Sequence, residues 1–352
     1  MSEPAAVRAT GFHRVQRRLT AAYAVILFIL LIAIEWRAES WLPLGLLAFA
    51  PPVLFALPLV VLMPLALRAR CWLLCITHAA CLACLALVFI TFRVHASHSS
   101  ATLTVITHNV GQGNRAAFVD SFPTEKPDAV LLQDVAKADI REKEYRRRYP
   151  TYRNRGVAQF ILLTPHEIEN AEPVGGVLWR GKPIAARFVI KVGGRSVAIY
   201  SVHLPTPRSS LAHVFSPRVA LEMCWLAKAP TDGFSSYREW LDARIALACS
   251  LAAVFDKETL PFIVGGDFNM PDHGIVYHTF ARQLTAAFAA TGHGWGMTFP
   301  GARDGRIPAL LGPWLRLDYW FAGHGWKPVD CRVADDAHSQ HRAVLARFNP
   351  TP

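Results

Sequence analysis

The chain has 352 residues, of which 52% are hydrophobic and 18% are charged, so it is more apolar than an ordinary soluble domain. Residues 1–100 carry eight Lys or Arg and three Asp or Glu, which leaves +6 of the net charge of +11 for residues 101–352. That surplus suits a phosphorylated substrate but is too small to indicate DNA binding by itself. The seven cysteines lack metal-ligand spacing, so neither a disulfide nor a zinc site is predicted.

Three long apolar runs lie in the first hundred residues, at 19–34, 41–67 and 71–92. Three uncharged runs in succession favour membrane-spanning helices over buried helices of a soluble protein. The second run contains Pro51-Pro52, which predicts a kink and leaves a broken or re-entrant helix as an alternative. A cleavable signal peptide is disfavoured, because no small-residue cleavage site precedes a soluble segment.

Basic residues predict the orientation of these helices. Arg14, Arg17 and Arg18 precede the first run, and Arg68 and Arg70 separate the second from the third. Positively charged segments stay in the cytoplasm, so three crossings place the rest of the chain outside it. If the second run does not fully cross, this orientation inverts. The predicted organisation is a cytoplasmic segment 1–18, a transmembrane region 19–92 with about three helices, a linker 93–101 and a globular domain.

Two strands are expected at the start of the globular part. Leu103–Val110 alternates β-branched and polar residues and carries Asn109 near its end. A helix is expected at Arg115–Phe122, and the apolar segment Ala129–Gln133 then predicts a buried strand followed by Asp134.

The next strands are expected at Val157–Leu163 and Val174–Trp179. Arg187–Val192 and Arg195–Val202 predict a hairpin around Gly193-Gly194, whose second strand delivers His203 at its end. The long mixed segment 206–242 is interrupted by prolines and is interpreted as an insertion over one rim. A helix is expected at 243–255.

The stretch Leu260–Pro271 (LPFIVGGDFNMP) predicts a buried strand that ends on two glycines. Asp267 and Asn269 stand two residues apart, so a continuing strand directs both to one side; an Asx turn at the strand end is the alternative. A carboxylate there can bind a hard cation or accept a proton, and a carboxamide can orient a phosphate oxygen.

The last strands are expected at Arg316–Ala322, which carries Asp318, and at Ala343–Phe348, which follows Ser339-Gln340-His341. Each polar residue at a strand end has a purely structural explanation, such as a turn, a helix cap or a local ion pair. Their repetition on successive strands favours a common site, because active sites of layered sheets gather at such ends. The candidates are Asn109, Asp134, His203, Asp267, Asn269, Asp318 and His341.

Over residues 102–349 the sequence resembles the endonuclease/exonuclease/phosphatase superfamily, which includes exonuclease III-like and deoxyribonuclease I-like enzymes. The motifs that carry the resemblance are HNV, LLQD, SVHLP, GGDFN and RLDYWF, at Asn109, Asp134, His203, Asp267 and Asp318. The resemblance implies an α/β (α+β) four-layer sandwich of two packed mixed β-sheets flanked by helices, here preceded by an all-α transmembrane segment. The apolar amino-terminal part looks like that of membrane-anchored bacterial members, which places the protein in a bacterial inner membrane.

The resemblance implies roles residue by residue. Asn109 and Asp134 match ligands of a divalent metal, usually Mg²⁺ (or Mn²⁺), although the family usually has Glu at the position of Asp134. Asp267 matches the residue that aligns or deprotonates the attacking water. His203, Asn269 and His341 match phosphate-binding positions, and Asp318 matches the carboxylate that orients His341.

Gln340 departs from the family pattern, which has Ser-Asp-His where this chain has Ser339-Gln340-His341. Gln340 can still offer a neutral oxygen to a metal, but the site loses one negative charge. Weaker or single-metal binding is therefore expected rather than loss of catalysis, with Asp335 or Asp336 as candidates to compensate.

The function predicted from these residues is in-line attack of water on a phosphate ester by a membrane-anchored, metal-dependent phosphoesterase. A nuclease needs basic residues along a groove; a phospholipid or headgroup phosphodiesterase needs an apolar rim near the bilayer. The alternative from another class is a catalytically silent, membrane-tethered binding module, supported by Gln340; a transporter is weaker still. No obligate protein partner is indicated.

The basic candidates for lining a nucleic-acid groove are Arg141, Arg146, Arg147, Arg148, Arg153 and Arg155. The apolar candidates for a rim near the bilayer are Leu211, Val214, Phe215, Trp225, Phe234 and Trp240.

Overall fold

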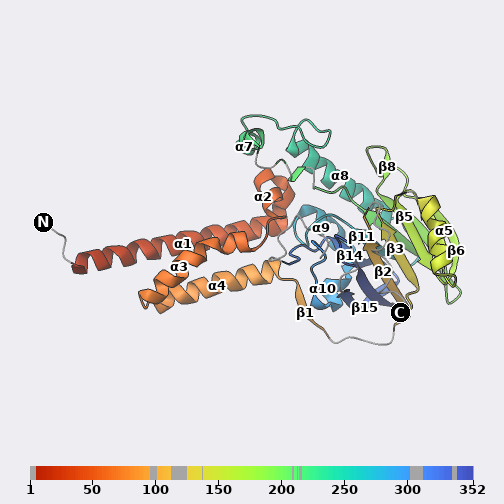
Figure 1. Ribbon diagram of the computed structural model, residues 1–352, viewed down its shortest axis with the longest axis horizontal. Helices are drawn as coiled ribbons and strands as arrows, with labels where there is room; N and C mark the ends of the chain where they lie inside the picture. The colour runs from red at the N-terminus through yellow and green to blue at the C-terminus, as the bar shows by residue number, and fades with distance from the viewer. Residues whose placement is uncertain are drawn as a thin grey trace.

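The computed structural model describes residues 5–95, 101–111, 125–136, 138–207, 210–211, 213, 216–301, 312–334 and 339–351. The helix expected at Arg115–Phe122 lies outside these ranges, as do Asp335 and Asp336. Figure 1 shows two parts: a group of helices that projects from one side, and a layered domain that contains the sheets.

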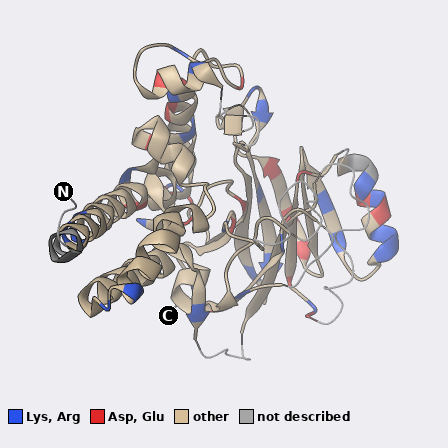
Figure 2. Ribbon diagram, turned by 60° about the vertical axis from the view of Figure 1, so that its left-hand side comes forward, with Lys and Arg blue, Asp and Glu red and all other residues tan. Residues whose placement is uncertain are grey.

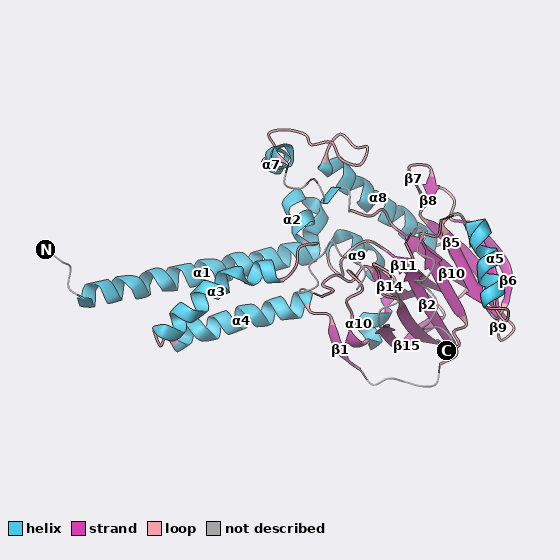
Figure 3. Ribbon diagram, viewed as in Figure 1, coloured by secondary structure: helices cyan, strands magenta, loops and turns pink. Residues whose placement is uncertain are grey.

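The projecting part consists of helices. Figure 3 shows the longer ones, α1, α3 and α4, lying side by side, while the short α2 lies close to the domain. Among the described residues, Gly11–Ser40 and Trp72–Phe89 are long and apolar enough to cross a membrane, which is weak evidence for a membrane anchor. The bounds are α1 (Ala5–Arg37), the 3₁₀ turn η1 (Ala38–Ser40), α2 (Leu42–Leu47), α3 (Val53–Arg68) and α4 (Trp72–Phe89).

The second apolar run is divided rather than kinked. Helix α2 ends at Leu47 and α3 begins at Val53, so the break falls around Pro51-Pro52. A proline lacks the N–H that a helix interior needs, and two in succession stop the helix here. The alternative of a broken helix is therefore confirmed for residues 41–67.

Two β-sheets face each other in the domain. Among the described residues each has six strands, in the orders β12-β14-β11-β10-β9-β6 and β15-β16-β2-β3-β5-β4. The first sheet contains β12 (Thr285–Ala286), β14 (Asp318–Ala322), β11 (Phe262–Asp267), β10 (Arg195–His203), β9 (Ala185–Val192) and β6 (Glu167–Pro173). The second contains β15 (Trp326–Val333), β16 (Val344–Pro350), β2 (Leu103–Asn109), β3 (Ala129–Gln133), β5 (Phe160–Thr164) and β4 (Arg153–Val157).

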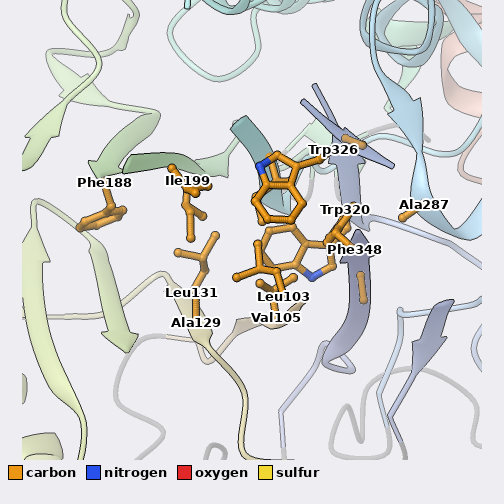
Figure 4. Packing of buried hydrophobic residues seen from close by; sticks show 14 of the residues in the cluster. Leu103, Val105, Ala129, Leu131, Phe188, Ile199, Ala287, Trp320, Trp326 and Phe348 are labelled. Atoms are coloured by element: carbon orange, nitrogen blue, oxygen red, sulfur yellow. The ribbon is translucent and has the colours of Figure 1, made fainter. Parts of the chain in front are cut away.

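Three apolar clusters separate four layers. Between the sheets, alternate residues of each strand interlock, and Figure 4 shows Leu131 from β3 facing Ile199 from β10, with Trp320 beside Leu103. A second cluster joins the outer face of the first sheet to α8 (Tyr237–Phe255) and α9 (Gly274–Ala281). A third joins the outer face of the second sheet to α5 (Ala138–Arg148). The predicted sandwich of two mixed sheets flanked by helices is confirmed.

Several smaller elements connect these layers. The insertion after β10 contains α7 (Pro217–Met223), and α10 (Ala287–Thr291) follows β12. Short pairs are formed by β7 (Leu178–Trp179) with β8 (Lys182–Pro183), and by β1 (Phe92–Val94) with β13 (His293–Trp295).

One strand prediction is shifted and a second is wrong. The segment 157–163 contains the end of β4, a turn at residues 158 and 159 and most of β5, and Ala158 in the turn has a φ of +54° that a continuous strand does not allow. The segment 174–179 is mostly loop, and the strand of that region is the preceding β6, whose sequence EIENAEP is largely exposed. This edge strand has an irregularity between Ile168 and Asn170, so its core-facing residues Ile168 and Ala171 stand three apart and its sequence shows no regular alternation.

A partly buried ion pair stabilises the outer face of the first sheet. Arg187 on β9 donates to both carboxylate oxygens of Glu258, at 2.7 and 3.1 Å, and the Tyr200 hydroxyl donates to the same carboxylate at 2.7 Å. Burial opposes ionisation of Glu258, but these hydrogen bonds outweigh it and lower its pKa to about 2.

We expect Glu258→Gln to lower the free energy of unfolding by about 3 kcal/mol, because it leaves the Arg187 guanidinium partly unpaired. The folded-state pKa is depressed, so this contribution is present above the unfolded pKa of about 4.3 and is lost as the pH falls toward 2. Thermal unfolding followed from pH 7 to pH 2.5 checks this. A difference between variant and wild type that did not shrink on acidification would contradict it.

Candidate active site

Strand register places three predicted residues in one row across the first sheet. His203 at the end of β10 pairs with Asp267 at the end of β11, and Asp267 pairs with Asp318 at the start of β14. On the second sheet, Asn109 at the end of β2 pairs with Gln133. All four strands present these residues at the same end of the sandwich, so the predicted convergence at strand ends is confirmed for these positions.

The two glycines before Asp267 are required by close packing. A side chain on Gly265 would collide with the Trp320 ring at 2.6 Å, and one on Gly266 would lie 2.0 Å from the Val202 carbonyl oxygen. Gly266 also has a φ of +147°. The expected close approach of backbone at this strand end is confirmed, and it fixes the direction of the Asp267 side chain.

Asp267 is fully buried and accepts hydrogen bonds on both oxygens. Its Oδ1 accepts from the Asn269 backbone N–H at 2.8 Å. Its Oδ2 accepts from the Asn109 amide at 2.8 Å and from the Asn269 amide at 3.1 Å. Burial raises the pKa of Asp267 and the neighbouring Asp318 adds to the effect, while His341, His203 and Asn109 oppose it.

Two imidazoles flank this carboxylate. The Nε2 atoms of His203 and His341 each lie 3.7 Å from Asp267 Oδ2. That distance is too long for a direct hydrogen bond, so both rings remain able to contact a third group placed against Asp267. A phosphate oxygen or a water molecule has the chemistry to fill that position.

Asp318 and His341 form the predicted pair. Asp318 Oδ2 lies 2.9 Å from His341 Nδ1, so the carboxylate orients the ring and directs Nε2 toward Asp267. Both residues are buried, and the Phe299 ring packs against the imidazole. Asp318 Oδ1 is also buried and has no hydrogen-bond partner among the described residues.

Asn269 has a different immediate role from the predicted one. Its backbone φ is +47°, a left-handed conformation that Asn tolerates, and this corresponds to the turn alternative rather than to a continuing strand. Its amide donates to the Leu204 carbonyl at 2.9 Å and to Asp267. The side chain therefore orients Asp267 directly, while its contact with a phosphate stays a prediction.

The predicted metal ligands are only partly brought together. Asn109 contacts Asp267 through its amide nitrogen, and its Oδ1 accepts from the Gly111 N–H at 3.0 Å. Asp134 directly follows Gln133, has a φ of +56° and is partly buried. Gln340 is partly buried and lies between Ser339 and His341 in the sequence. The Ser339 hydroxyl donates to the Asn109 carbonyl at 2.7 Å. Metal binding by Asn109, Asp134 and Gln340 stays a prediction.

A cluster that can hold a metal ion lies in the centre of the site. Among the described residues, Asp267, Asp318 and His341 offer ligand atoms that all lie within 4.8 Å of one another. Carboxylate oxygens suit a hard divalent cation, and Asp318 Oδ1 still has its acceptor capacity. The donor set therefore fits such an ion chemically.

Several supporting residues were not predicted. Gln159 lies in the turn between β4 and β5, and its Oε1 accepts from His203 Nδ1 at 2.8 Å and so fixes that ring. Gln133 donates to Thr107 and Ser201, both at 3.0 Å, and thus joins the two sheets beneath the site. The Thr298 hydroxyl accepts from the Asp318 N–H at 3.2 Å. Among these residues, only Gln133 could have been found from the sequence, because it is a polar residue at the end of a predicted buried strand.

Comparison with known proteins agrees with this geometry. The family model described as the endonuclease/exonuclease/phosphatase family matches residues 106–341. No curated protein is significantly similar to the chain in sequence. The two similar solved structures described next are 16% and 13% identical to the chain, so they show the fold alone. An endonuclease/exonuclease/phosphatase from Bacteroides vulgatus is 16% identical with a TM-score of 0.51, and the match covers 71% of this chain and 99% of that one. A functionally unknown conserved protein from Enterococcus faecalis V583 is 13% identical with a TM-score of 0.50, with coverage of 71% and 100%.

The matched segment runs from β2 to His341 and contains every residue of the row His203, Asp267 and Asp318. The family model covers well over half of the chain, and the solved structures share its sandwich of sheets. The chain therefore belongs to the endonuclease/exonuclease/phosphatase family, whose enzymes hydrolyse phosphoester bonds.

Proposed function

We propose that the protein is a membrane-anchored phosphodiesterase that uses a divalent cation, Mg²⁺ or Mn²⁺, and a water molecule activated at Asp267. The observation that carries this proposal is the buried Asp267 carboxylate with the Nε2 atoms of His203 and His341 both 3.7 Å from the same oxygen. A general base and two imidazoles around one position match the needs of in-line attack on a phosphate.

The residues divide the chemistry between them. Asp267, held by Asn109 and Asn269, accepts the proton of the attacking water. His203 and His341 contact the phosphoryl oxygens, where an imidazolium stabilises the negative charge that develops in the transition state. Asp318 keeps the His341 ring in the orientation and tautomer that this contact needs.

A divalent cation would neutralise charge on the phosphate oxygens. The family resemblance assigns its ligands to Asn109, Asp134 and Gln340, and the central cluster offers Asp267 and Asp318 as further hard oxygens. Gln340 is neutral where the family has a carboxylate, so affinity for the cation is expected to be lower than with Asp at this position.

We expect Gln340→Asp to raise the apparent affinity for Mg²⁺ about tenfold, because it adds a negative charge beside the predicted ligands. The activation constant for Mg²⁺ in steady-state hydrolysis measures this, with Gln340→Glu as a length control. An unchanged activation constant in both variants would mean that residue 340 does not face the cation.

We propose that α1, α3 and α4 form a multi-pass anchor in a bacterial inner membrane with the domain outside the cytoplasm. Figure 2 shows Lys and Arg at the outer ends of these helices. In the sequence, Arg14 and Arg17 lie in the amino-terminal half of α1, Arg68 ends α3 and Arg70 precedes α4. Charges at the outer ends support a cytoplasmic location for them. Helix α3, with 16 residues, would be about 24 Å long against a hydrocarbon core of about 30 Å, so its crossing needs local adjustment of the bilayer.

Protease added to intact spheroplasts tests this orientation. Digestion of the domain in intact spheroplasts supports an extracytoplasmic site. Protection until the membrane is lysed contradicts it and indicates two crossings instead of three.

A phospholipid headgroup is the second candidate substrate, supported by the insertion after β10. Val219 of α7 and Leu42 of α2 belong to one apolar cluster with Trp240 of α8, and the residues that follow α7, Trp225 and Leu226, are 64% and 74% exposed. Of the other apolar candidates in the insertion, Trp240 is buried, Phe234 packs against the same cluster, Leu211 is partly buried, and Val214 and Phe215 lie outside the described residues.

The basic residues considered for a nucleic-acid groove are less favourably placed. Arg146, Arg147 and Arg148 form the last turn of α5, and Arg141 pairs with Glu144 at 2.6 Å. Helix α5 begins at Ala138, four residues after Asp134, so its last turn lies about 15 Å further along the helix.

Turnover of DNA, RNA and phospholipid vesicles by the detergent-purified protein separates these candidates. Each substrate is offered with Mg²⁺ and with chelator. Mg²⁺-dependent cleavage of any of them supports a phosphodiesterase and identifies the class. If the protein cleaves none of the three substrates and also leaves a generic phosphate diester intact, the result supports the catalytically silent binding module.

A further inference from the structure

A buried arginine joins the loop that follows His203 to the loop that follows Asp267, here called the His203 and Asp267 loops. Arg244, on α8, is 4% exposed. Its Nη1 donates to the Pro205 carbonyl, two residues after His203, and its Nη2 donates to the Asn269 carbonyl at 2.8 Å, two residues after Asp267. One planar guanidinium thus spans both loops with a fixed fork geometry that the ammonium group of a lysine lacks.

The same two loops also bind each other directly. The Leu204 N–H donates to the Asp267 carbonyl at 3.0 Å, and the Asn269 amide donates to the Leu204 carbonyl at 2.9 Å. The backbone around Asn269 is in a left-handed conformation. A strained turn of this kind persists only where its surroundings hold it, and Arg244 bonds to its carbonyl.

Two negative charges partly offset the burial of the guanidinium. Burial lowers the pKa of Arg244 to about 10, and the negative charges of Glu39 and Asp267 oppose this. The group therefore stays protonated at neutral pH. Glu39 belongs to η1, the turn that ends the first apolar helix, so one of the two balancing charges comes from outside the sandwich.

Glu39 is itself fixed against the segment that follows Asn269. Its Oε2 accepts from the Ile275 N–H at 2.6 Å at the start of α9. Gly274, with a φ of +90°, leaves room for the carboxylate, since a Cβ there would lie 2.6 Å from Oε2. Nearby, His278 lies 3.2 Å from Glu35 and stacks on Trp36, so the end of α1 is docked on α9 by several contacts.

We propose that Arg244 is a positioning residue that holds the His203 and Asp267 loops in register, and that Glu39 at the end of the first apolar helix supports it. The proposal rests on the proposed phosphodiesterase function for its catalytic consequence. The amino-terminal helices are then part of the support of the active site as well as an anchor.

Arg244→Lys is the direct test, with Arg187→Lys as the matched control. Both residues are arginines whose guanidinium groups are hydrogen-bonded on the first-sheet side of the sandwich. Arg187 donates to Glu258 and contacts neither loop, whereas Arg244 donates to both loops. On a generic phosphate diester, we expect Arg244→Lys to lower kcat about 10- to 100-fold with little change in KM, because misplaced reacting groups slow chemistry more than binding. Arg187→Lys should retain kcat. Glu39→Gln should lower kcat several-fold.

Hydrogen exchange of the full-length protein gives a readout that does not need activity. Arg244→Lys should speed exchange in peptides covering 203–206 and 267–271, and Arg187→Lys should not. A variant with wild-type kcat, or with exchange in these peptides no faster than in the control, overturns the proposal. If the wild type hydrolyses no ester, the proposed function fails, and exchange alone then decides whether Arg244 positions the loops.

Discussion

Asp267→Asn is expected to lower kcat about 10³- to 10⁴-fold on any phosphate diester that the protein hydrolyses. The carboxylate lies where three N–H groups converge, from the Asn269 backbone and the amides of Asn109 and Asn269. An amide in its place cannot accept a proton from water. It also presents its own N–H₂ to these donors, so at least one hydrogen bond is lost.

The fold should survive this substitution. Burial raises the pKa of Asp267, so ionising it in the folded state costs stability above its unfolded pKa of about 3.9, and a neutral amide removes that cost. Circular dichroism and the melting temperature check the fold. Asp256→Asn, at the exposed end of α8, is the control for loss of a carboxylate and should retain full activity. Activity within tenfold of wild type in Asp267→Asn would remove Asp267 from the mechanism.

The same carboxylate sets the acid side of the pH–rate profile. Catalysis needs Asp267 ionised, and its pKa is raised by burial, so activity should fall on acidification at a pH above the ordinary range for Asp. This limb should be absent from the residual activity of Asp267→Asn.

Asp318→Asn is expected to have a comparably large effect, a loss of about 10³- to 10⁴-fold in kcat. Asp318 Oδ2 lies 2.9 Å from His341 Nδ1, so the carboxylate accepts the Nδ1 proton and stabilises the imidazolium that contacts the phosphate through Nε2. An amide there lacks this negative charge and can donate to Nδ1, which keeps the ring neutral. KM should change less than kcat, because the charge that the ring stabilises develops in the transition state.

Asp330→Asn is the matched control for this substitution. Asp330 is equally buried and accepts from Arg347 at 2.9 Å, but it lies on β15, in the other sheet. Both variants should lose stability, and only Asp318→Asn should lose turnover. Equal kcat in the two variants would show that the Asp318–His341 pair serves the fold alone.

The sequence was informative where local pattern decides structure. The glycines before Asp267, the hairpin around Gly193-Gly194 and the alternation in β2 each predict a strand with a polar residue at its end. Strand pairing then brings His203, Asp267 and Asp318 into one row, as expected for a sheet with its site at one end.

Other contacts join distant parts of the chain, and the local sequence pattern does not predict them. Gln159 reaches His203 because the turn between β4 and β5, in the second sheet, lies next to the end of β10, in the first sheet. Arg244 lies in α8, and the apolar pattern of that helix predicts only packing. The first six residues of α8, 237–242, were expected to belong to the insertion and not to a helix. The docking of Glu39 on α9 joins residues 236 apart in the chain, and no periodicity indicates such a pair.

The apolar runs illustrate the same limit. Composition predicts three long helices, and the structure has α1 and α4 of sufficient length with a shorter α3 between them. The prolines at 51 and 52 mark the break, but composition alone does not indicate that α2 would pack against the catalytic domain through Leu42.

Hydrolysis of bis(p-nitrophenyl) phosphate by the full-length protein, stripped with chelator and then titrated with Mg²⁺, tests the central claim most directly. The site described by His203, Asp267 and His341 predicts no turnover in chelator, recovery on adding Mg²⁺ or Mn²⁺, and no recovery in Asp267→Asn. Turnover that is indifferent to chelator and metal, or that is fully retained in Asp267→Asn, would contradict it.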